Sequence, residues 1–427
     1  MSSLSLLPRG GVEALADRHC SDTIFNMHIV SIDIKGFRSL RDVAGWCPAA
    51  LNVIIGPNGA GKSNLLRALE LLAVSARGGL GESVKGSGGI EPLLWDGSTG
   101  AIEFTVRCSP PEPHRDVVKD ALTYQLRLER VGKTGEYRIG YEMLGNDWKM
   151  RQGLTQQPFK FLTREGQRAH IFDDQERMLA APEENIPERE TLLSLAADPF
   201  TQNRILSLFR SQMAAWSIYH DFHTNRNATV RQPAVTRSEK RVAPDGQNLI
   251  SVLHTLYAGD REFKKEINAA MTAAFGNDFD ELIFAPDSGD QRIQLRVRWK
   301  SLKREQSAAD LSDGTLRFLF LLTVLASPDP APLIAIDEPE TGLHPSMLPI
   351  VAEYAIDAAQ RTQIILTTHS PQFLDAFKKI TPRTTVAQWD NGTTTLKTIS
   401  DDELALWLKD YSLGALHRNG ELESLAG

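Results

Sequence analysis

The pattern of hydrophobic and polar residues predicts a strand, a second strand and a helix in the first part of the chain. Residues 28–34 (HIVSIDI) alternate Ile and Val with polar residues, as a strand does. Residues 51–55 (LNVII) are almost uniformly apolar, which predicts a short buried strand. Apolar residues then recur with a helical period over residues 64–76. This succession is typical of an α/β core.

The middle of the chain changes character twice. Residues 77–100 include six glycines between positions 78 and 89, which predicts a surface loop. Alternating segments then predict an antiparallel meander over residues 101–107, 122–130 and 137–144. Helical periodicity follows over residues 188–197, 201–213, 247–256 and 262–275. These helices predict an insertion between two halves of the core.

Strands return in the last third of the chain. Residues 291–299 alternate strictly, an apolar helix begins at Thr315, and short apolar runs predict buried strands at residues 333–336 and 363–366. The predicted fold class is therefore α/β, with a mixed sheet core, an antiparallel β meander and a helical insertion. The predicted segments are an N-terminal appendage (1–27), an N-terminal lobe (28–165), a mainly helical insertion (166–285) and a C-terminal lobe (286–427).

Composition fits a soluble globular protein with more than one lobe. The chain has 427 residues, more than one compact core usually holds. Its three cysteines are an odd number without metal-binding spacing, which favours a reducing cytoplasm. The longest apolar run, residues 318–326, is about half of the ~18 residues that a membrane span needs. We therefore expect a cytoplasmic protein without a membrane partner.

Residues 56–63 (GPNGAGKS) fit the phosphate-loop pattern G-x-x-x-x-G-K-[ST] at every fixed position. In such a loop successive backbone N–H groups surround phosphate oxygens at the positive end of the following helix. We expect Lys62 to neutralise the β- and γ-phosphates and the Ser63 hydroxyl to bind Mg²⁺. The predicted nucleotide-binding residues are Asn58, Gly59, Ala60, Gly61, Lys62, Ser63 and Asn64.

Two acids end the buried strand at residues 333–336. Asp337 stands at the carboxyl end of that strand, where ligands bind in open α/β sheets, and is predicted to hold Mg²⁺. Glu338 is the predicted general base for the attacking water. His369 ends the next predicted strand. A single histidine is more often structural, but its position favours hydrogen bonding to the γ-phosphate or to the attacking water.

A second phosphate-binding element is predicted where the helix at Thr315 begins. Ser312, Asp313 and Gly314 precede it, and a helix start with free N–H groups and a serine binds phosphate readily. Lys62 and Ser312 are 250 residues apart, so both elements need not contact one nucleotide. The glutamine that senses the γ-phosphate through Mg²⁺ stays open among Gln152, Gln156 and Gln157.

Two segments are rich in basic residues. Residues 226–241 form a predicted connector, and residues 291–304 include a strand with Arg292, Arg296 and Arg298 on one face. A net charge of −7 disfavours general coating of nucleic acid but allows a local basic groove. Each segment is either a solvated surface or a contact for DNA, RNA or a protein partner.

Together the motifs resemble the ABC-type ATPase heads of the RecF, OLD and SMC superfamily, and most closely the RecF/OLD-like ATPases without a TOPRIM domain. GPNGAGKS resembles Walker A, LIAIDEPETGLHP resembles Walker B with its D-loop, LSDGTLR the signature motif and TTHSP the His-switch. IVSIDIKGFRSL is similar to the family's opening strand, in which an arginine like Arg38 reaches the nucleotide phosphates. The resemblance covers residues 28–76 and 245–418. Asp313 departs from it, because transporters and SMC proteins commonly have glycine there.

The resemblance implies an ATPase with ATP and Mg²⁺ as cofactors that forms a head-to-tail homodimer or a higher homo-oligomer. Ser312 and Gly314 of one copy would then close on ATP held by Lys62 of the other, and hydrolysis at Glu338 would reset the assembly. The stretch after His369 is too short for a TOPRIM domain, so an effector nuclease would be a separate chain.

Three functions follow as hypotheses. The first is a sensor or regulator in DNA repair or anti-phage defence that controls a separately encoded effector. The second is a stand-alone RecF-like repair ATPase that binds DNA. The third, the ATP-binding subunit of a transporter, is disfavoured by the RecF-like opening strand, the large insertion and the GLHP segment.

Overall fold

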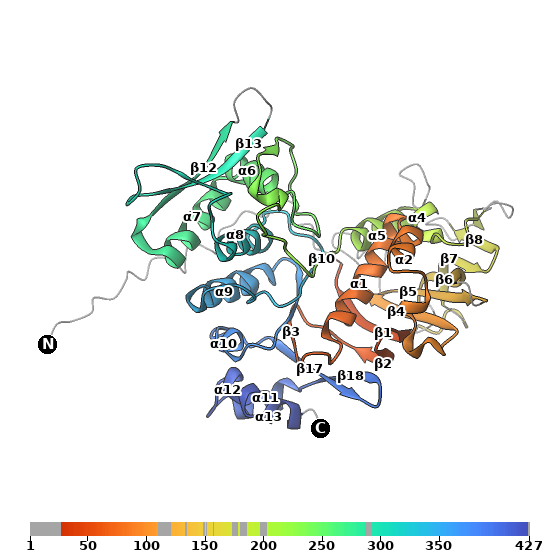
Figure 1. Cartoon of the computed structure of the whole chain (residues 1–427). Coiled ribbons are helices and arrows are strands. Elements are labelled where there is room, and N and C mark those ends of the chain that lie inside the picture. The colour runs from red at the N-terminus through yellow and green to blue at the C-terminus, as the bar shows by residue number, and fades with distance from the viewer. Residues whose placement is uncertain are drawn as a thin grey trace.

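The computed structural model describes residues 27–109, 121–132, 135–147, 150, 152–156, 158–172, 178–179, 186–196, 203–286 and 292–425. Apart from Met27, the predicted appendage at residues 1–27 lies outside the described residues. The described residues form three sheets with helices packed on both sides of the central one (Figure 1). None of their helices is long and apolar enough to cross a membrane.

The central sheet has six strands among the described residues, in the order β10–β15–β16–β3–β17–β18. Its first five strands are parallel and its edge strand is antiparallel, which confirms the predicted mixed core. The strands are β10 (Ser217–Tyr219), β15 (Leu333–Ile336), β16 (Gln363–Thr367), β3 (Leu51–Ile55), β17 (Arg383–Asp390) and β18 (Thr393–Thr398). The predicted strands at residues 51–55 and 333–336 are confirmed with the same bounds.

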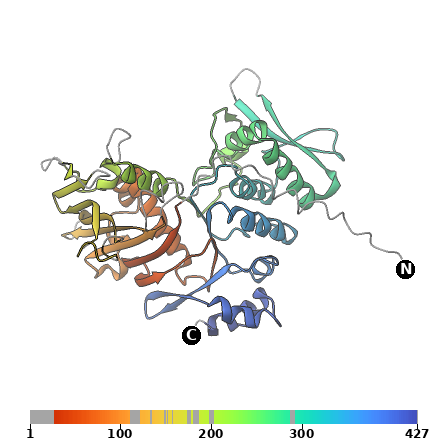
Figure 2. The ribbon, with the colours of Figure 1, turned by 180° about the vertical axis from the view of Figure 1, so that it is seen from behind.

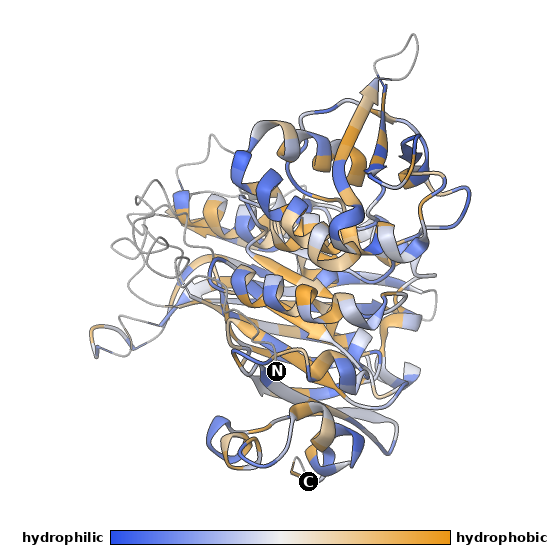
Figure 3. Ribbon diagram, turned by 90° about the vertical axis from the view of Figure 1, so that its left-hand side faces the viewer, coloured by the Kyte–Doolittle hydropathy of each residue, from blue (hydrophilic) through white to orange (hydrophobic). Residues whose placement is uncertain are grey.

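The central sheet is buried on both faces because its apolar side chains alternate between two cores. In β3, Val53 and Ile55 join one core, whereas Ile54 joins the other. β15 does the same, with Ile336 in the first core and Ala335 in the second. Figure 3 shows the apolar residues concentrated on these strands and on the helix faces that contact them. A short run with few polar residues is therefore what a two-sided strand requires.

The two faces carry different helices (Figures 1 and 2). One face packs on α1 (Lys62–Arg77), which contacts α2 (Leu80–Gly86), α4 (Leu192–Ala196) and α5 (Arg204–Ala214). The other face packs on α8 (Asp313–Leu325), α9 (Leu348–Ala358) and α10 (Pro371–Leu374). The C-terminal helices α11 (Asp401–Trp407), α12 (Leu413–Arg418) and α13 (Glu421–Leu425) continue beyond α10.

The predicted meander is confirmed, and it is larger than predicted. Eight described strands pair antiparallel in the order β2–β1–β4–β5–β6–β7–β8–β9. They are β1 (Ile29–Phe37), β2 (Leu40–Trp46), β4 (Ala101–Cys108), β5 (Leu122–Val131), β6 (Glu136–Asn146), β7 (Phe159–Glu165), β8 (Arg168–Phe172) and β9 (Met178–Leu179). The sheet lies against α1, on the side away from α8 (Figure 1).

Two predictions about the middle of the chain are wrong. Residues 166–285 are rich in helix but do not form one separate insertion, because β8 and β9 complete the meander and β10 belongs to the central sheet. These strands are too short to show a period of two over several residues. Residues 77–100 are not a plain loop, since α2 forms there with Leu80 and Val84 buried.

The part of the insertion beyond β10 forms a small lobe together with residues 292–307, which were predicted to belong to the C-terminal lobe. It contains α6 (Leu249–Gly259), α7 (Arg261–Phe275) and a sheet of β11 (Ala234–Val235), β13 (Arg292–Trp299), β12 (Phe279–Pro286) and β14 (Gln306–Ser307). The helices confirm the periodicity at residues 247–256 and 262–275. α6 and α7 contact α8, the helix that begins at the predicted signature motif. The lobe and α8 therefore belong to one hydrophobic core.

The side chain of Gln363 links the meander to the central sheet through hydrogen bonds. Its Oε1 accepts a hydrogen bond from the Ile29 N–H (2.9 Å), and its Nε2 donates to the carbonyls of Ile29 (3.0 Å) and Ala49 (3.1 Å). The side chain is 1% exposed. We predict that Gln363→Leu lowers the free energy of unfolding by about 2–3 kcal/mol, because it leaves buried backbone groups without partners.

The urea midpoint with an unchanged slope measures this loss. The matched control is Gln152→Leu, an exposed glutamine whose replacement should change stability by less than about 0.5 kcal/mol. Equal midpoints for the two variants would contradict the role given to Gln363.

Candidate active site

The order of the parallel strands brings the predicted motifs to one edge. β16 lies between β3 and β15, with Leu366 opposite both Val53 and Ile336. The carboxyl ends of the three strands therefore meet, and each continues directly into a predicted motif. The phosphate loop follows β3, Asp337 follows β15, and Thr368 and His369 follow Thr367, the last residue of β16.

The phosphate loop wraps around Lys62. Its Nζ donates hydrogen bonds to the carbonyls of Gly56 (2.7 Å) and Pro57 (3.1 Å), and the residue is 5% exposed. Burial lowers the pKa of Lys62, while the nearby carboxylates of Glu338 and Asp337 act in the opposite direction. Lys62 and both predicted acids thus share one electrostatic environment.

Two neighbouring elements pack on the loop and require glycine at position 61. Gly61 has φ +94°, and a Cβ there would meet Thr394 Oγ1 at 2.0 Å and Ser39 Oγ at 2.7 Å. Asn64 Nδ2 and the Thr394 hydroxyl also donate to Ser39 Oγ, each at 2.7 Å. The β1–β2 turn and the β17–β18 hairpin therefore fix the loop from outside.

Arg38 lies in the same β1–β2 turn. Its backbone has φ +48°, a left-handed conformation that costs energy for a residue with a Cβ. Burial, and next the charge of Arg67, lower the pKa of Arg38. Its Nε is buried without a hydrogen-bond partner among the described residues. An anion is the natural partner for such a guanidinium.

Asp337 is held by its backbone and by its carboxylate. Its N–H donates to the Tyr219 carbonyl (2.8 Å), and its carboxylate accepts hydrogen bonds from the hydroxyls of Thr367 and Ser63. Burial opposes ionisation, but His220 and these two hydroxyls outweigh it and lower the pKa of Asp337. A charged carboxylate therefore stands beside the hydroxyl of the phosphate loop.

The side chains of the two predicted catalytic residues contact each other. His369 Nδ1 lies 3.0 Å from Glu338 Oε1, and the Glu338 N–H donates to Thr367 Oγ1 (3.0 Å). Glu338 also has a left-handed backbone, with φ +48°. Strain of this kind persists where the surroundings hold a side chain for a purpose. Here it presents a half-buried carboxylate beside Asp337.

Ser63 and Asp337 fit a magnesium ion. A hydroxyl and a carboxylate are hard oxygen ligands, and Mg²⁺ commonly uses one or two protein ligands together with phosphates and water. Within the described part of the chain, no group of three or more His, Cys, Asp or Glu side chains could hold a metal ion by itself. The donor set therefore suits a metal that arrives with a nucleotide.

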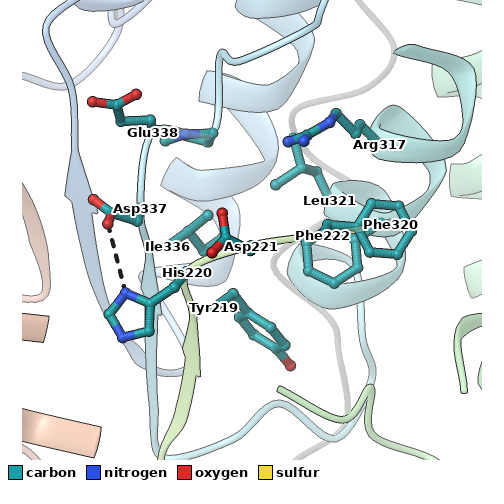
Figure 4. A pocket seen from close by; sticks show the side chains of 11 residues that line it. Tyr219, His220, Asp221, Phe222, Arg317, Phe320, Leu321, Ile336, Asp337 and Glu338 are labelled. Carbon is teal, nitrogen blue, oxygen red and sulfur yellow. Dashed lines mark ion pairs between the residues drawn. The ribbon is translucent and has the colours of Figure 1, made fainter. Parts of the chain in front are cut away.

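His220 was not predicted from the sequence, although it contacts the centre of the site. It follows β10 directly, and its ring faces Asp337 (Figure 4). Its Nδ1 lies 3.6 Å from Asp337 Oδ2, and its Nε2 lies 3.3 Å from Glu70 Oε2 in α1. Burial opposes the charge of His220, but the contacts with Asp337 and Glu70 outweigh it and raise its pKa to about 9.

The glutamine candidates do not reach this position among the described residues. Gln152 and Gln156 are exposed in the connection between β6 and β7, and Gln157 lies outside the described residues. The polar side chain that faces Asp337 is instead His220, the residue after β10. A histidine after a three-residue strand has no periodic pattern around it, so only the pairing of β10 with β15 reveals it.

The signature element lies apart from the phosphate loop. Ser312 caps α8, since its Oγ accepts from the Thr315 N–H (3.1 Å), and a Cβ on Gly314 would meet the Gly342 carbonyl at 2.8 Å. No hydrogen bond or ion pair of the described residues joins residues 312–314 to the phosphate loop. α8 and α1 cover opposite faces of the central sheet (Figure 1).

Much of the positive charge of the two basic segments is used within the fold. Arg231 is buried against Asp313, and Arg241 pairs with Asp329 (3.0 Å). On β13, Arg298 pairs with Glu281 (2.7 Å) and Glu305 (3.0 Å), and Arg296 also contacts Glu305. Arg226 and Lys240 are exposed and have no ion pair with described residues.

We predict that Thr367→Val lowers kcat about 10- to 100-fold and leaves nucleotide affinity close to that of the natural protein. The Thr367 hydroxyl links Asp337 to the Glu338 backbone, and a hydrogen bond to a charged group is worth about 1.5–3 kcal/mol. Steady-state ATPase rates and titration with a fluorescent nucleotide measure the two effects. Thr367→Ser keeps the hydroxyl and should stay near the natural rate; a similar loss in both variants would contradict the prediction.

Comparisons with known proteins agree with this geometry. A family model described as "AAA domain, putative AbiEii toxin, Type IV TA system" matches residues 51–375. The chain is similar to the OLD nuclease of Thermus scotoductus, with 24% identity over 353 residues, 81% of this chain and 59% of the relative. It is also similar to an ATP/GTP phosphatase of Helicobacter pylori, with 21% identity over 361 residues, 82% of this chain and 88% of the relative.

A solved structure shows the same fold. The SMC head bound to the C-winged helix domain of ScpA matches with a TM-score of 0.56 and 14% identity, over 89% of this chain and 99% of that chain. This likeness confirms the predicted P-loop ATPase head. The chain spans about three fifths of the length of the OLD nuclease that it matches.

Proposed function

Because the chain belongs to the AAA domain family whose model matches residues 51–375, and is an ATPase of the RecF, OLD and SMC type, we propose that two copies close on ATP and Mg²⁺. Hydrolysis would then separate them. The single observation that supports this proposal is the division of the site. Lys62, Asp337 and Glu338 converge within one chain, whereas residues 312–314 start a helix on the opposite face of the sheet.

Each residue of the converged cluster has a role in hydrolysis. Lys62 neutralises the β- and γ-phosphates, and the backbone N–H groups of the loop bind their oxygens. Glu338 accepts the proton of the attacking water, and His369 orients its carboxylate through the 3.0 Å contact. Arg38 supplies a buried guanidinium for a phosphate oxygen.

Ser63 and Asp337 would hold Mg²⁺ when the nucleotide is bound. The ion supplies charge that stabilises the developing negative charge on the phosphate oxygens. The hydroxyl of Thr367 keeps the Asp337 carboxylate in place for this contact. Asp337 is ionised in the folded chain, which is the form that a metal requires.

We further propose that the assembly is a cytoplasmic sensor or regulator in DNA repair or anti-phage defence, and that it controls a separately encoded effector such as a TOPRIM-like nuclease. Two of the similarities support this proposal. The similar protein of Thermus scotoductus is an OLD nuclease, and the family description refers to a toxin–antitoxin system. A nuclease gene beside this one would support it, whereas membrane permease genes would contradict it.

Our central prediction concerns Glu338→Gln. Without the general base ATP stays bound, so ATP should convert the protein from 47.3 kDa to twice that mass. Light scattering after size exclusion, with and without ATP and Mg²⁺, measures the change. Lys62→Ala is the control, because it should neither bind nor hydrolyse ATP and should stay at the monomer mass. An unchanged mass of Glu338→Gln with saturating ATP would refute the closed pair.

A second prediction tests the alternative of a stand-alone DNA-binding repair ATPase. The exposed cations Arg226, Arg237 and Lys240 are its candidate contacts, because they can be changed without breaking the buried pair at Asp313. If they bind DNA, replacing all three by Glu should weaken binding and flatten its salt dependence. Filter binding of duplex DNA across a salt series measures this. Equal affinity and slope would assign these residues to a solvated surface.

A further inference from the structure

Arg231 is a buried arginine directly behind the signature element. It ends the short helical turn η5 (Thr229–Arg231), between β10 and β11. Its side chain is 8% exposed, although it belongs to a segment whose other cations are exposed. An arginine is seldom buried unless every donor of its guanidinium has an acceptor.

Its donors all reach the loop that leads into α8 or the segment beside it. Nη1 donates to the carbonyls of Ala308 (3.1 Å), Ala309 (3.1 Å) and Leu311 (2.7 Å). Nε donates to the Thr224 carbonyl (2.6 Å). A single guanidinium therefore determines the path of the backbone immediately before Ser312.

The remaining donor contacts Asp313. Arg231 Nη2 lies 2.5 Å from Asp313 Oδ1, and the Asp313 side chain is 65% exposed. This hydrogen bond lowers the pKa of Asp313, so its carboxylate is charged. A free carboxylate in the first turn of α8 would repel a nucleotide phosphate approaching the helix end. Arg231 supplies the positive charge that compensates Asp313. Asp313 stands where transporters and SMC proteins commonly have glycine.

The segment that carries Arg231 also contacts the chain's own catalytic cluster. It begins at His220, which faces Asp337, and continues to Phe222. The Phe222 ring stacks on Phe320 of α8, with centroids 4.4 Å apart and an interplanar angle of 12° (Figure 4). Residues 220–231 thus contact Asp337, the predicted Mg²⁺ ligand, at one end and the signature element at the other.

We propose that Arg231 is a positioning residue that shapes the signature element for the nucleotide held by a second copy of this chain. It fixes the backbone before Ser312 and neutralises Asp313, so that Ser312 and Gly314 can face phosphate. This inference rests on the proposed closed pair. It assigns the best-buried arginine of the basic segment to the assembly surface and not to DNA.

The test combines variants in the Glu338→Gln background. Arg231→Gln should raise the protein concentration needed for ATP-dependent dimerisation about tenfold or more, because charge-assisted contacts are lost. Nucleotide affinity of the separate chain should stay unchanged, since Lys62 is untouched. Arg231→Lys should also raise the protein concentration needed for dimerisation, because one ammonium group cannot replace the several contacts of the guanidinium. The matched control is Arg261→Gln, an exposed arginine at the start of α7, which should dimerise normally.

Mixing separates a defective assembly surface from a defective fold. Arg231→Gln retains an intact catalytic cluster, and Lys62→Ala retains an intact signature element. With the natural Glu338 in both chains, each variant should have little ATPase activity alone, and an equimolar mixture should regain it, because a mixed pair contains one complete site. A mixture that stays inactive although both chains remain folded would overturn the proposal.

Two further outcomes keep the inference separate from the proposed function. If Glu338→Gln dimerises with ATP and its Arg231→Gln derivative does so equally well, the inference fails while the closed pair stands. If Arg231→Gln does not fold, Asp313→Ala replaces it, since it leaves the carbonyl contacts of Arg231 in place. Asp313→Ala removes the carboxylate that Arg231 neutralises, so ATP-dependent dimerisation should stay equal or become tighter, and a severalfold loss would overturn the proposal.

Discussion

The position of β16 between β3 and β15 is the constraint on which the site depends. Parallel pairing on both sides of β16 aligns the three carboxyl ends, so that Thr367 reaches Asp337 and the Glu338 backbone. The His369–Glu338 pair follows from the same alignment. Without this strand order, the phosphate loop and the two acids would be separate motifs. The pairing is stable because all three strands are buried on both faces, where backbone groups without partners would be costly.

The same two-sided burial explains why the phosphate loop and the signature element lie on opposite faces of the central sheet. Side chains of the central strands alternate between a core with α1 and a core with α8. The phosphate loop therefore begins the helix on one face, and the signature element begins the helix on the other. In the proposed closed pair, one copy would bring its phosphate loop and the other its signature element to one nucleotide. Residues 220–231 connect Asp337 and the signature element within a chain, through His220 at one end and Arg231 at the other.

Several charged residues of this protein form contacts within the fold, although the sequence predicts that their segments are exposed. Arg231 and Arg298 lie in segments that look like surfaces for nucleic acid, yet Arg231 holds a loop and Arg298 pairs with two glutamates. The departure at Asp313 has its explanation in the same contact. An acid in the signature element is tolerable because a buried arginine lies 2.5 Å away. The sequence alone does not show that Asp313 and Arg231 are in contact.

Local sequence was sufficient for the phosphate loop, for the strands at residues 51–55 and 333–336, and for the positions of Lys62 and Asp337 after these strands. Their signals lie within a few consecutive residues, where backbone conformation and burial follow from nearest neighbours. It was not sufficient for His220, which follows a strand of three residues, nor for Arg231, whose carbonyl acceptors before Ser312 lie 77 to 80 residues further along the chain. Strand order and the burial of a charge depend on pairings between distant segments. Those pairings form only when the chain closes on itself, and a local pattern therefore cannot contain them.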